Sequence, residues 1–378
     1  MASSETTASV AHIMKQPETG APVRLLSLDA FRGLTLLFMV LVNNGGGPVS
    51  YPPLEHSAWN GWTMTDTVFP SFLWIAGVAI TLALGRHLEA GEAPGKLLRI
   101  VFRRAVIIYM LGLLVYAFPH FSFSHQRLLG VLQRIAICYL AASIIYLYCG
   151  VRTQIIWIIS LFAVYWGLMA FIDVPGYGPG NLTVEGNFAH YVDRIVLGAH
   201  NYASTKTWDP EGIVSTLPAI GTALLGVMAG HILRLTIPLA ARRNRLLIAG
   251  GFLIALGLIW NLKLPINKKL WTDSFATFMA GLDFVVLAVF LWLVDERGIR
   301  KWIKPLTIAG MNAITVYLAS EFLSEFLDAT PLHHIIYSRY FAPIASPPNA
   351  SLLWALSFTL LMYLLAWFLY RRRWFLRI

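Results

Sequence analysis

The sequence predicts an all-α membrane protein with about ten transmembrane helices, and three observations support that fold class. Hydrophobic residues make up 57 % of the 378 residues and charged residues only 13 %, whereas soluble domains carry about 25 %. Apolar runs of about 20 residues, the length of a helix that crosses a bilayer, recur along the whole chain. Basic residues gather between these runs. Composition and spacing therefore indicate a polytopic membrane protein rather than a series of soluble domains.

Ten apolar spans can be placed on the sequence. The first contains Asp29 and Arg32 near its start, and Asn43, Asn44 and three glycines close it. The predicted spans are 26–44, 67–85, 100–118, 131–149, 154–172, 213–235, 244–262, 273–294, 305–325 and 350–370. Residues 24–378 are interpreted as one transmembrane domain. Residues 1–23 are polar, lack the apolar core of a signal peptide, and are expected to form a flexible cytoplasmic tail.

The distribution of Lys and Arg predicts the orientation. An even number of spans places both termini on the same side. Of the 29 Lys and Arg residues, 20 fall on the side of the termini, eight on the opposite side, and Arg32 inside the first span. Because cytoplasmic segments are enriched in Lys and Arg, both termini are predicted to be cytoplasmic, in an inner or plasma membrane. The longer connections on the other side, including 45–66 and 173–212, are then non-cytoplasmic.

Several other classes of protein and site are not indicated. The net charge of +10 does not indicate a nucleic-acid partner, because no basic stripe with interleaved aromatic residues accompanies it. Cys138 and Cys149 share one apolar span at a helical separation of about 16 Å, too far apart for a disulfide. No zinc-ligand spacing, Walker loop or dinucleotide fingerprint occurs, and the adjacent His333 and His334 are a weak metal signal. No metal site is predicted.

The densest group of polar residues lies in and beside the predicted loop between the first two spans. The loop holds His56, Asn60 and Asp66, follows Asn43, and has no Lys or Arg. A histidine, a carboxylate that orients it and amide donors are the groups that general-base acyl transfer requires. Trp59 suits the membrane interface or stacking on a sugar. The alternative is that His56 is only a histidine of an interfacial loop.

Polar and ionisable residues within or beside the spans form a second group of candidates. Ionisable groups are rare in membrane helices and usually face a cavity or a partner, so Arg134 is favoured over any loop arginine. For Asp29 and Arg32, an internal salt bridge is an equal alternative to ligand binding. For Asp209, the alternative is that it merely caps the start of a helix. The ligand-binding candidates are Asp29, Arg32, Asn44, Trp59, Asn60, Gln133, Arg134, Asp209, Glu211, Asn267, Lys268, Lys269, Asn312 and Glu321.

Many of these residues fall in motifs that resemble the heparan-α-glucosaminide N-acetyltransferase family and its short bacterial relatives. The resemblance covers about residues 24–378. The motifs are Leu28–Gly33, Asn43–Gly47, His56–Gly61, Asp66–Pro70, Gly130–Arg134, Asp209–Gly212, Pro265–Lys268, Gly310–Asn312 and Tyr370–Arg373. Ser320 departs from the pattern, because the human member has a histidine at that place. This departure leaves the acceptor open.

The resemblance implies a membrane acetyltransferase that moves the acetyl group of acetyl-CoA to the amine of a glucosamine-type sugar. It also implies that His56 and Asn43 are catalytic. His56 is expected to accept the proton of the attacking amine, oriented by Asp66 or Asp29, and Asn43 or Asn44 to donate to the oxyanion. A route through an acetyl-imidazole remains open.

The other expected partners are the CoA phosphates, the lipid bilayer and, as one option, a second copy of the chain. Arg134 and Lys268 or Lys269 are the cations expected to bind the phosphates. A transporter of a sugar or related small polar solute is the main alternative, since polar groups in the spans and a glycine break after the first span would suit one. A non-catalytic membrane assembly or sensor protein is a third reading, which leaves the polar cluster without a role.

Overall fold

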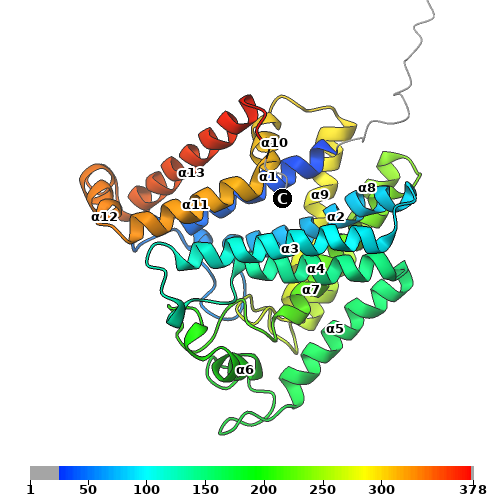
Figure 1. Cartoon of the computed structure of the whole chain (residues 1–378), viewed down its shortest axis with the longest axis horizontal. Coiled ribbons are helices and arrows are strands. Elements are labelled where there is room, and N and C mark those ends of the chain that lie inside the picture. Colours follow the sequence, from blue (N-terminus) through cyan, green and yellow to red (C-terminus); the bar gives the residue numbers. More distant parts are fainter. Residues whose placement is uncertain (1–24, 376–378) are drawn as a thin grey trace, which may run out of the picture.

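Residues 25–375, the part of the chain that the computed structural model describes, fold into helices without a β-strand (Figure 1). The tail predicted over 1–23 lies outside this part. The long helices are α1 (Leu26–Asn43), α2 (Val68–Glu89), α3 (Pro94–Ala117), α4 (Val131–Tyr148), α5 (Val151–Phe171), α7 (Thr216–Arg234), α8 (Leu239–Trp260), α9 (Asp273–Phe290) and α13 (Pro347–Arg371). The shorter ones are α6 (Phe188–Val196), α10 (Lys304–Met311), α11 (Ala313–Asp328) and α12 (Leu332–Ile336).

The helices confirm the predicted fold class. Within residues 25–375, nine helices are long and apolar enough to cross a membrane, and the bent pair of α10 and α11 makes a tenth if it counts as one span. Helix α9 reaches its full span only with the π-helical segment Leu291–Glu296 that continues it. Helix α3 begins at Pro94, before the predicted start at residue 100. Its first turns carry Lys96 and Arg99, which a search for apolar runs excludes.

The predicted span 305–325 is not one straight helix, and this is a correction to the sequence-based assignment. Helices α10 and α11 meet at Asn312 with a bend of 77°. Helix α10 packs tightly on α1, because a Cβ added to Gly33 would lie 1.8 Å from the carbonyl oxygen of Leu306. Contacts through small residues let membrane helices approach closely. Hydropathy does not reveal the bend, since apolar residues continue on both sides of Asn312.

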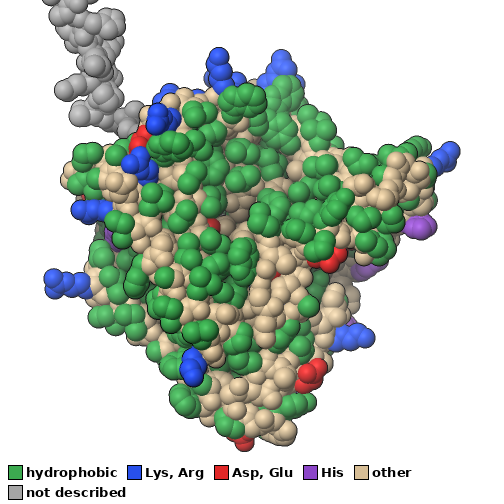
Figure 2. Space-filling view, turned by 180° about the vertical axis from the view of Figure 1, so that it is seen from behind, with side chains coloured by type: hydrophobic (Ala, Val, Ile, Leu, Met, Phe, Trp, Pro, Cys, Tyr) green, Lys and Arg blue, Asp and Glu red, His purple; other side chains and the backbone are tan. Residues whose placement is uncertain are grey.

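The outer surface is apolar over broad areas, as expected for a protein surrounded by lipid. Large hydrophobic side chains such as Ile156 and Phe171 on α5 and Phe252 and Ile259 on α8 are exposed. In Figure 2, hydrophobic side chains spread over the visible face while most Lys and Arg side chains lie near its outline. A water-facing surface would have charged residues distributed across it.

The connections 44–67, 118–130, 172–215 and 261–272 meet at one end of the bundle, here called the loop face. The α3–α4 connection and α6 lie at its lower left in Figure 1. The Gly61 amide donates to the carbonyl of Ile266 at 2.8 Å, and the indole N–H of Trp59 donates to the carbonyl of Leu182 at 3.1 Å. The first loop is thereby fixed against two segments that are distant in sequence, and its side chains have defined positions.

Candidate active site

His56 and Asp66 form a hydrogen-bonded pair at the loop face. The Nδ1 atom of His56 lies 2.7 Å from Oδ1 of Asp66. The Asp66 side chain is only 1 % exposed, whereas that of His56 is 48 % exposed. A deprotonated Asp66 accepts a hydrogen bond, so the pair assigns the His56 proton to Nδ1 and makes Nε2 the nitrogen that can accept a proton. That is the arrangement of an oriented general base.

Local sequence explains why Asp66 holds this position. Residues Met64–Thr67 form a 3-10 turn with a capping box, in which Asp66 Oδ2 accepts from the Thr63 amide at 3.0 Å. The same oxygen accepts from the Ser57 amide at 3.0 Å. These bonds compensate for burying a carboxylate and tie the loop that carries His56 to the start of α2. Asp66 is therefore pre-positioned by backbone contacts before it binds His56.

Lys268 adds a cation to this pair. Its Nζ lies 3.0 Å from His56 Nδ1, 3.4 Å from His56 Nε2 and 3.6 Å from Asp66 Oδ1. Burial lowers the pKa of the Lys268 ammonium, and the nearby carboxylates of Asp66 and Glu211 oppose that shift. The Asn267 carboxamide donates to Asn60 at 3.2 Å, and Lys269 donates to the carbonyl of Ala58. The two segments that carry the site are thus joined at several points.

A cavity of about 590 Å³ opens beside the His56–Asp66 pair. It brings together residues of the first loop, α1, α3, the 261–272 segment and α11. The sequence-predicted residues that line it are Asn43, Asn44, His56, Trp59, Asp66, Glu211, Lys268, Lys269 and Glu321. Two further ligand-binding candidates, Asn60 and Asn267, are not among the residues that line the cavity; their hydrogen bond joins the first loop to the 261–272 segment.

The two asparagines at the end of α1 differ in their contacts. Asn44 is buried, and its amide nitrogen donates back to the carbonyl of Val40 at 2.8 Å. Asn43 is exposed, and its side chain lines the cavity together with Glu321. Sequence reasoning left either asparagine as the oxyanion donor. The geometry favours Asn43, because the Asn44 amide is engaged within its own helix.

Arg127 is a residue that sequence reasoning passed over. Its guanidinium donates to both carboxylate oxygens of Asp209, at 2.7 and 2.6 Å, and to Glu211 at 2.5 Å. Its side chain is 10 % exposed, and it also lies over the rings of Tyr116 and Tyr202. Burial opposes ionisation of Glu211, but the cations Arg127, Arg134 and Lys268 together outweigh burial, and the pKa of Glu211 stays below its ordinary value.

Only weak signals in the sequence could have indicated Arg127. It is one of the few basic residues on the predicted non-cytoplasmic side, and the acidic pair Asp209 and Glu211 lies on the same side. Their contact joins positions 82 residues apart, which a single sequence does not reveal. Capping of the following helix by Asp209 was the alternative, and it is wrong, because α7 begins at Thr216 with Ser215 before it. Asp209 instead accepts from the Glu211 amide at 2.9 Å in the connection that precedes α7.

Arg134 is buried in the bundle beneath this network. Its guanidinium donates to the carbonyl of Gly212 at 3.0 Å and to the Ser215 hydroxyl, and it lies 5.1 Å from the ring centre of Trp271. Among residues 25–375, its hydrogen-bond partners do not include the carboxylates of Asp29 and Glu321. The neighbouring Gln133 is fully buried close to Gly112. Both positions favour a role in supporting the site, and phosphate binding by Arg134 stays a prediction.

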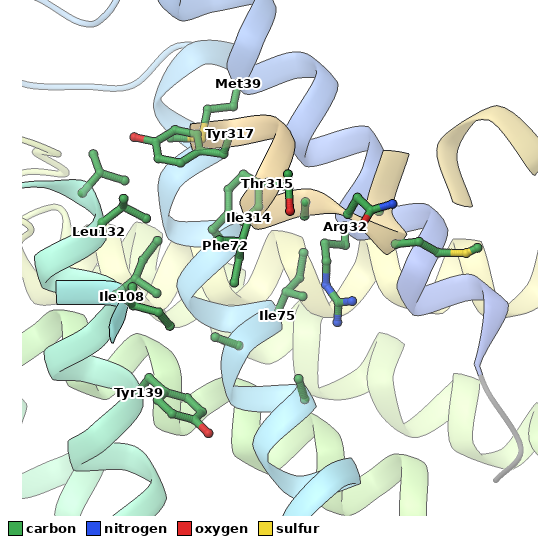
Figure 3. Close-up of a pocket in the computed structure, with 18 of the residues that line it drawn as sticks. Arg32, Met39, Phe72, Ile75, Ile108, Leu132, Tyr139, Ile314, Thr315 and Tyr317 are labelled. Atoms are coloured by element: carbon green, nitrogen blue, oxygen red, sulfur yellow. The ribbon is translucent and has the colours of Figure 1, made fainter. Parts of the chain in front are cut away.

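A second cavity, of about 350 Å³, lies deeper in the bundle (Figure 3). The Arg32 side chain extends from α1 and lies beside Ile75 in Figure 3, and Arg104 and Asn312 also line the cavity. Arg32 lies 3.3 Å from Asp29, as the salt-bridge alternative expected. Asn312 is 4 % exposed, and its side-chain amide has no hydrogen-bond partner among the described residues. The second cavity adjoins the first, because Met39, Val131 and Tyr317 line both.

Comparison with known proteins identifies the family. The profile described as heparan-α-glucosaminide N-acetyltransferase, catalytic, matches residues 24–250. The chain belongs to this family. It is 30 % identical over 370 aligned residues to the mouse protein named heparan-α-glucosaminide N-acetyltransferase, covering 82 % of this chain and 56 % of that protein. It is also 30 % identical over 362 residues to the human protein of the same name, covering 81 % and 54 %. The chain thus spans about half the length of these relatives.

The region matched by the heparan-α-glucosaminide N-acetyltransferase profile contains most of the site. His56, Asp66, Asn43 and Arg127 all fall within residues 24–250. Lys268, Glu321 and Asn312 lie beyond it, yet the first two line the same cavity as His56. The site is therefore assembled from both halves of the chain.

Proposed function

We propose that this protein is a membrane acetyltransferase that moves the acetyl group of acetyl-CoA to the amine of a glucosamine-type sugar. The observation that carries the proposal is the His56–Asp66 pair, 2.7 Å apart, at the edge of a polar cavity in a chain of the N-acetyltransferase family. Arranged in this way, Nε2 of His56 takes a proton from the amine while the nitrogen attacks the thioester carbonyl. Asp66 stabilises the imidazolium that forms.

Asn43 is the proposed oxyanion donor. The tetrahedral intermediate carries a negative charge on the former carbonyl oxygen, and a fixed N–H donor in a site shielded from water stabilises it. Asn43 lines the same cavity as His56, at the end of α1. When the C–S bond breaks, the imidazolium of His56 returns its proton to the sulfur of CoA. His56 is then neutral again, ready for the next turnover.

The deeper cavity is proposed to hold the phosphate-bearing part of CoA. Arg32 and Arg104 line it, and Asn312 stands at the N-terminal end of α11 with its side-chain amide unpaired among the described residues. Cations, a helix N-terminus and a free amide together suit a phosphate group. Arg32 and Asn43 are separated along α1 by about 16 Å, a distance that the extended pantetheine arm can span. The thioester then reaches the first cavity.

Acetyl-CoA would enter this arrangement from the side where the chain begins. The loop face is proposed to be non-cytoplasmic and both termini cytoplasmic. The reason is that the connections on the side opposite the loop face contain most of the Lys and Arg residues. The donor then enters from the cytoplasm, and the amine acceptor approaches from the loop face. Pairing with a second copy of the chain also stays a prediction.

Release of free thiol from acetyl-CoA by purified protein in detergent tests the activity, with and without glucosamine. Wild-type protein should release thiol in a glucosamine-dependent manner. His56→Ala should lower turnover by about 10²–10⁴, the usual contribution of a positioned general base, without changing affinity for CoA. His120→Ala is the matched control, because His120 is an exposed histidine in the α3–α4 connection. Equal turnover of His56→Ala and His120→Ala would remove His56 as the base.

A transporter is the second candidate, and the bend at Asn312 is the observation that favours it. Broken membrane helices line the substrate sites of many transporters, and α10 and α11 meet at 77° beside two adjoining cavities. Counterflow of labelled glucosamine in proteoliposomes would support transport. Thiol release that depends on glucosamine, without counterflow, would support the enzyme.

A further inference from the structure

Glu321 faces the first cavity from α11, on a wall formed with Asn43 and Tyr317. The same cavity is lined by His56. Asn43 and Tyr317 present polar side chains to the same cavity beside the Glu321 carboxyl. One cavity therefore contains the oriented histidine and a carboxylate that the mechanism above does not use.

The cations of this cavity have closer partners than Glu321. Arg127 is held by Asp209 and Glu211. Lys268 contacts His56 and Asp66, and Lys269 donates to a backbone carbonyl. Across residues 25–375, no Lys, Arg or His lies within ion-pair distance of Glu321. The Glu321 carboxylate therefore lines the cavity beside Asn43 without a cationic partner among residues 25–375.

A carboxylate placed at membrane depth is costly unless it binds a cation or a proton. The acceptor of the proposed reaction supplies a cation and a transferable proton, because a sugar amine is an ammonium ion near neutral pH. We infer that Glu321 binds the ammonium group of the acceptor and takes its first proton, as a second base beside His56. This inference rests on the proposed acetyltransferase function and deepens it, since it assigns an acceptor that arrives as a cation.

The proton balance requires such a group. The ammonium has three N–H bonds and the amide product has one. Glu321 takes the first proton and leaves the neutral amine, whose nitrogen forms the C–N bond with the acetyl carbon. His56 takes the second proton as this bond forms, and passes it to the CoA sulfur when the C–S bond breaks. The products are the N-acetyl sugar, CoA thiol and protonated Glu321, which releases its proton to water before the next turnover.

The shared cavity of Glu321 and Asn43 places this step near the reacting carbonyl. A carboxamide has two N–H donors, so one can bind the Glu321 carboxylate while the other points to the oxyanion. An amine bound at Glu321 is then adjacent to the group that polarises the thioester. Glu321 would act on the acceptor alone, whereas His56 acts on any nucleophile that attacks the acetyl group.

Two acceptors of different charge separate these roles. Glucosamine arrives as an ammonium ion, whereas hydroxylamine is largely uncharged near neutral pH and needs no first deprotonation. Glu321→Gln should lower kcat/KM for glucosamine on the order of 10²-fold and change that for hydroxylamine by no more than a few-fold. Glu321→Asp should recover part of the glucosamine activity. His56→Ala should lower the rate with both acceptors.

Glu325→Gln is the matched control, since Glu325 lies one turn further along α11 and lines the same cavity. If Glu325→Gln and not Glu321→Gln impairs glucosamine selectively, the inference is overturned. Equal losses of Glu321→Gln with both acceptors would also overturn it, because the residue would then act on the donor or on the fold. Wild-type protein that releases no thiol with either acceptor would instead refute the proposed function.

Discussion

Lys268 Nζ lies 3.0 Å from Nδ1 of His56, although the two residues are 212 positions apart in the chain. The ammonium is also 3.6 Å from Asp66, so a cation, an imidazole and a carboxylate share one corner of the cavity. The sequence indicated Lys268 as a cation for CoA phosphates. Its position beside the histidine favours a role in holding the catalytic pair instead.

Replacing Lys268 distinguishes these two roles. Lys268→Met keeps the apolar stem and removes the ammonium, together with its 3.6 Å ion pair with the buried Asp66 carboxylate. We expect kcat to fall by roughly 10–10², while KM for acetyl-CoA stays within a few-fold of wild type. Steady-state kinetics with varied acetyl-CoA measure both. A raised KM with unchanged kcat would return Lys268 to phosphate binding, and Lys269→Met provides the comparison with its neighbour.

Asp66 should affect rate more than donor binding. Asp66→Asn preserves shape but presents a neutral amide to His56, which no longer stabilises the imidazolium. We expect turnover to fall by about 10²–10⁴, and the double variant with His56→Ala to lose little more than either alone, because the two residues act as one unit. Thiol release by the single and double variants measures this. Losses that multiply would show that the two residues act independently.

The membrane architecture and the first loop could be predicted from the sequence, because both depend on local information. Apolar runs of spanning length identified the helices, and His56, Asn60 and Asp66 fall within one short segment. The bend at Asn312 and the partners of Arg127 could not be predicted. The bend depends on close packing of α10 against α1, and the Arg127 contacts join distant segments. Arg134 was favoured as the functional arginine because it lies within a predicted span, whereas the arginine that lines the first cavity is Arg127.

Arg127 should be needed for stability of the loop face. Removing one partner of a buried ion pair costs about 3–5 kcal/mol, because the remaining charge is left uncompensated. Arg127→Met leaves Asp209 and Glu211 without their cation, so we expect a clear fall in Tm in detergent, with a smaller fall for Arg127→Lys. Arg339→Met serves as the control, since Arg339 is exposed. A Tm for Arg127→Met equal to that of the control would contradict the structural role.

His190 should make the loop face less stable in acid. Burial lowers the pKa of His190 to about 3, and its ring stacks on Trp208 at 4.0 Å. The unfolded state takes up a proton near pH 6.5 but the folded state does not, so folding is disfavoured as pH falls below that value. This histidine should therefore cost about 2 kcal/mol of stability between pH 7 and pH 5.

The variant His190→Phe keeps the stacked ring and removes the titration. Its Tm should fall less than that of wild type when the pH is lowered from 7 to 5. Asp193 acts in the opposite sense, because burial raises its pKa to about 6 and its protonation in the folded state favours folding as pH falls. Asp193 is present in both proteins, so the difference between them isolates His190. Identical pH dependence of the two proteins would show that His190 is protonated within the fold.

The orientation of the chain can be tested with single cysteines. Ala90 is exposed in the connection before α3 and Ser122 in the connection after it, so the two residues lie at opposite ends of this helix. Cys138 is buried and Cys149 partly buried, and both are replaced to give a background without thiols. Ser122→Cys should react with an impermeant thiol reagent in intact cells, and Ala90→Cys only after the membrane is opened. The reason is the excess of Lys and Arg at the Ala90 end, which favours the cytoplasm. Labelling of Ala90→Cys alone in intact cells would show that the orientation is the reverse of the predicted one, and the acceptor would then approach His56 from the cytoplasm.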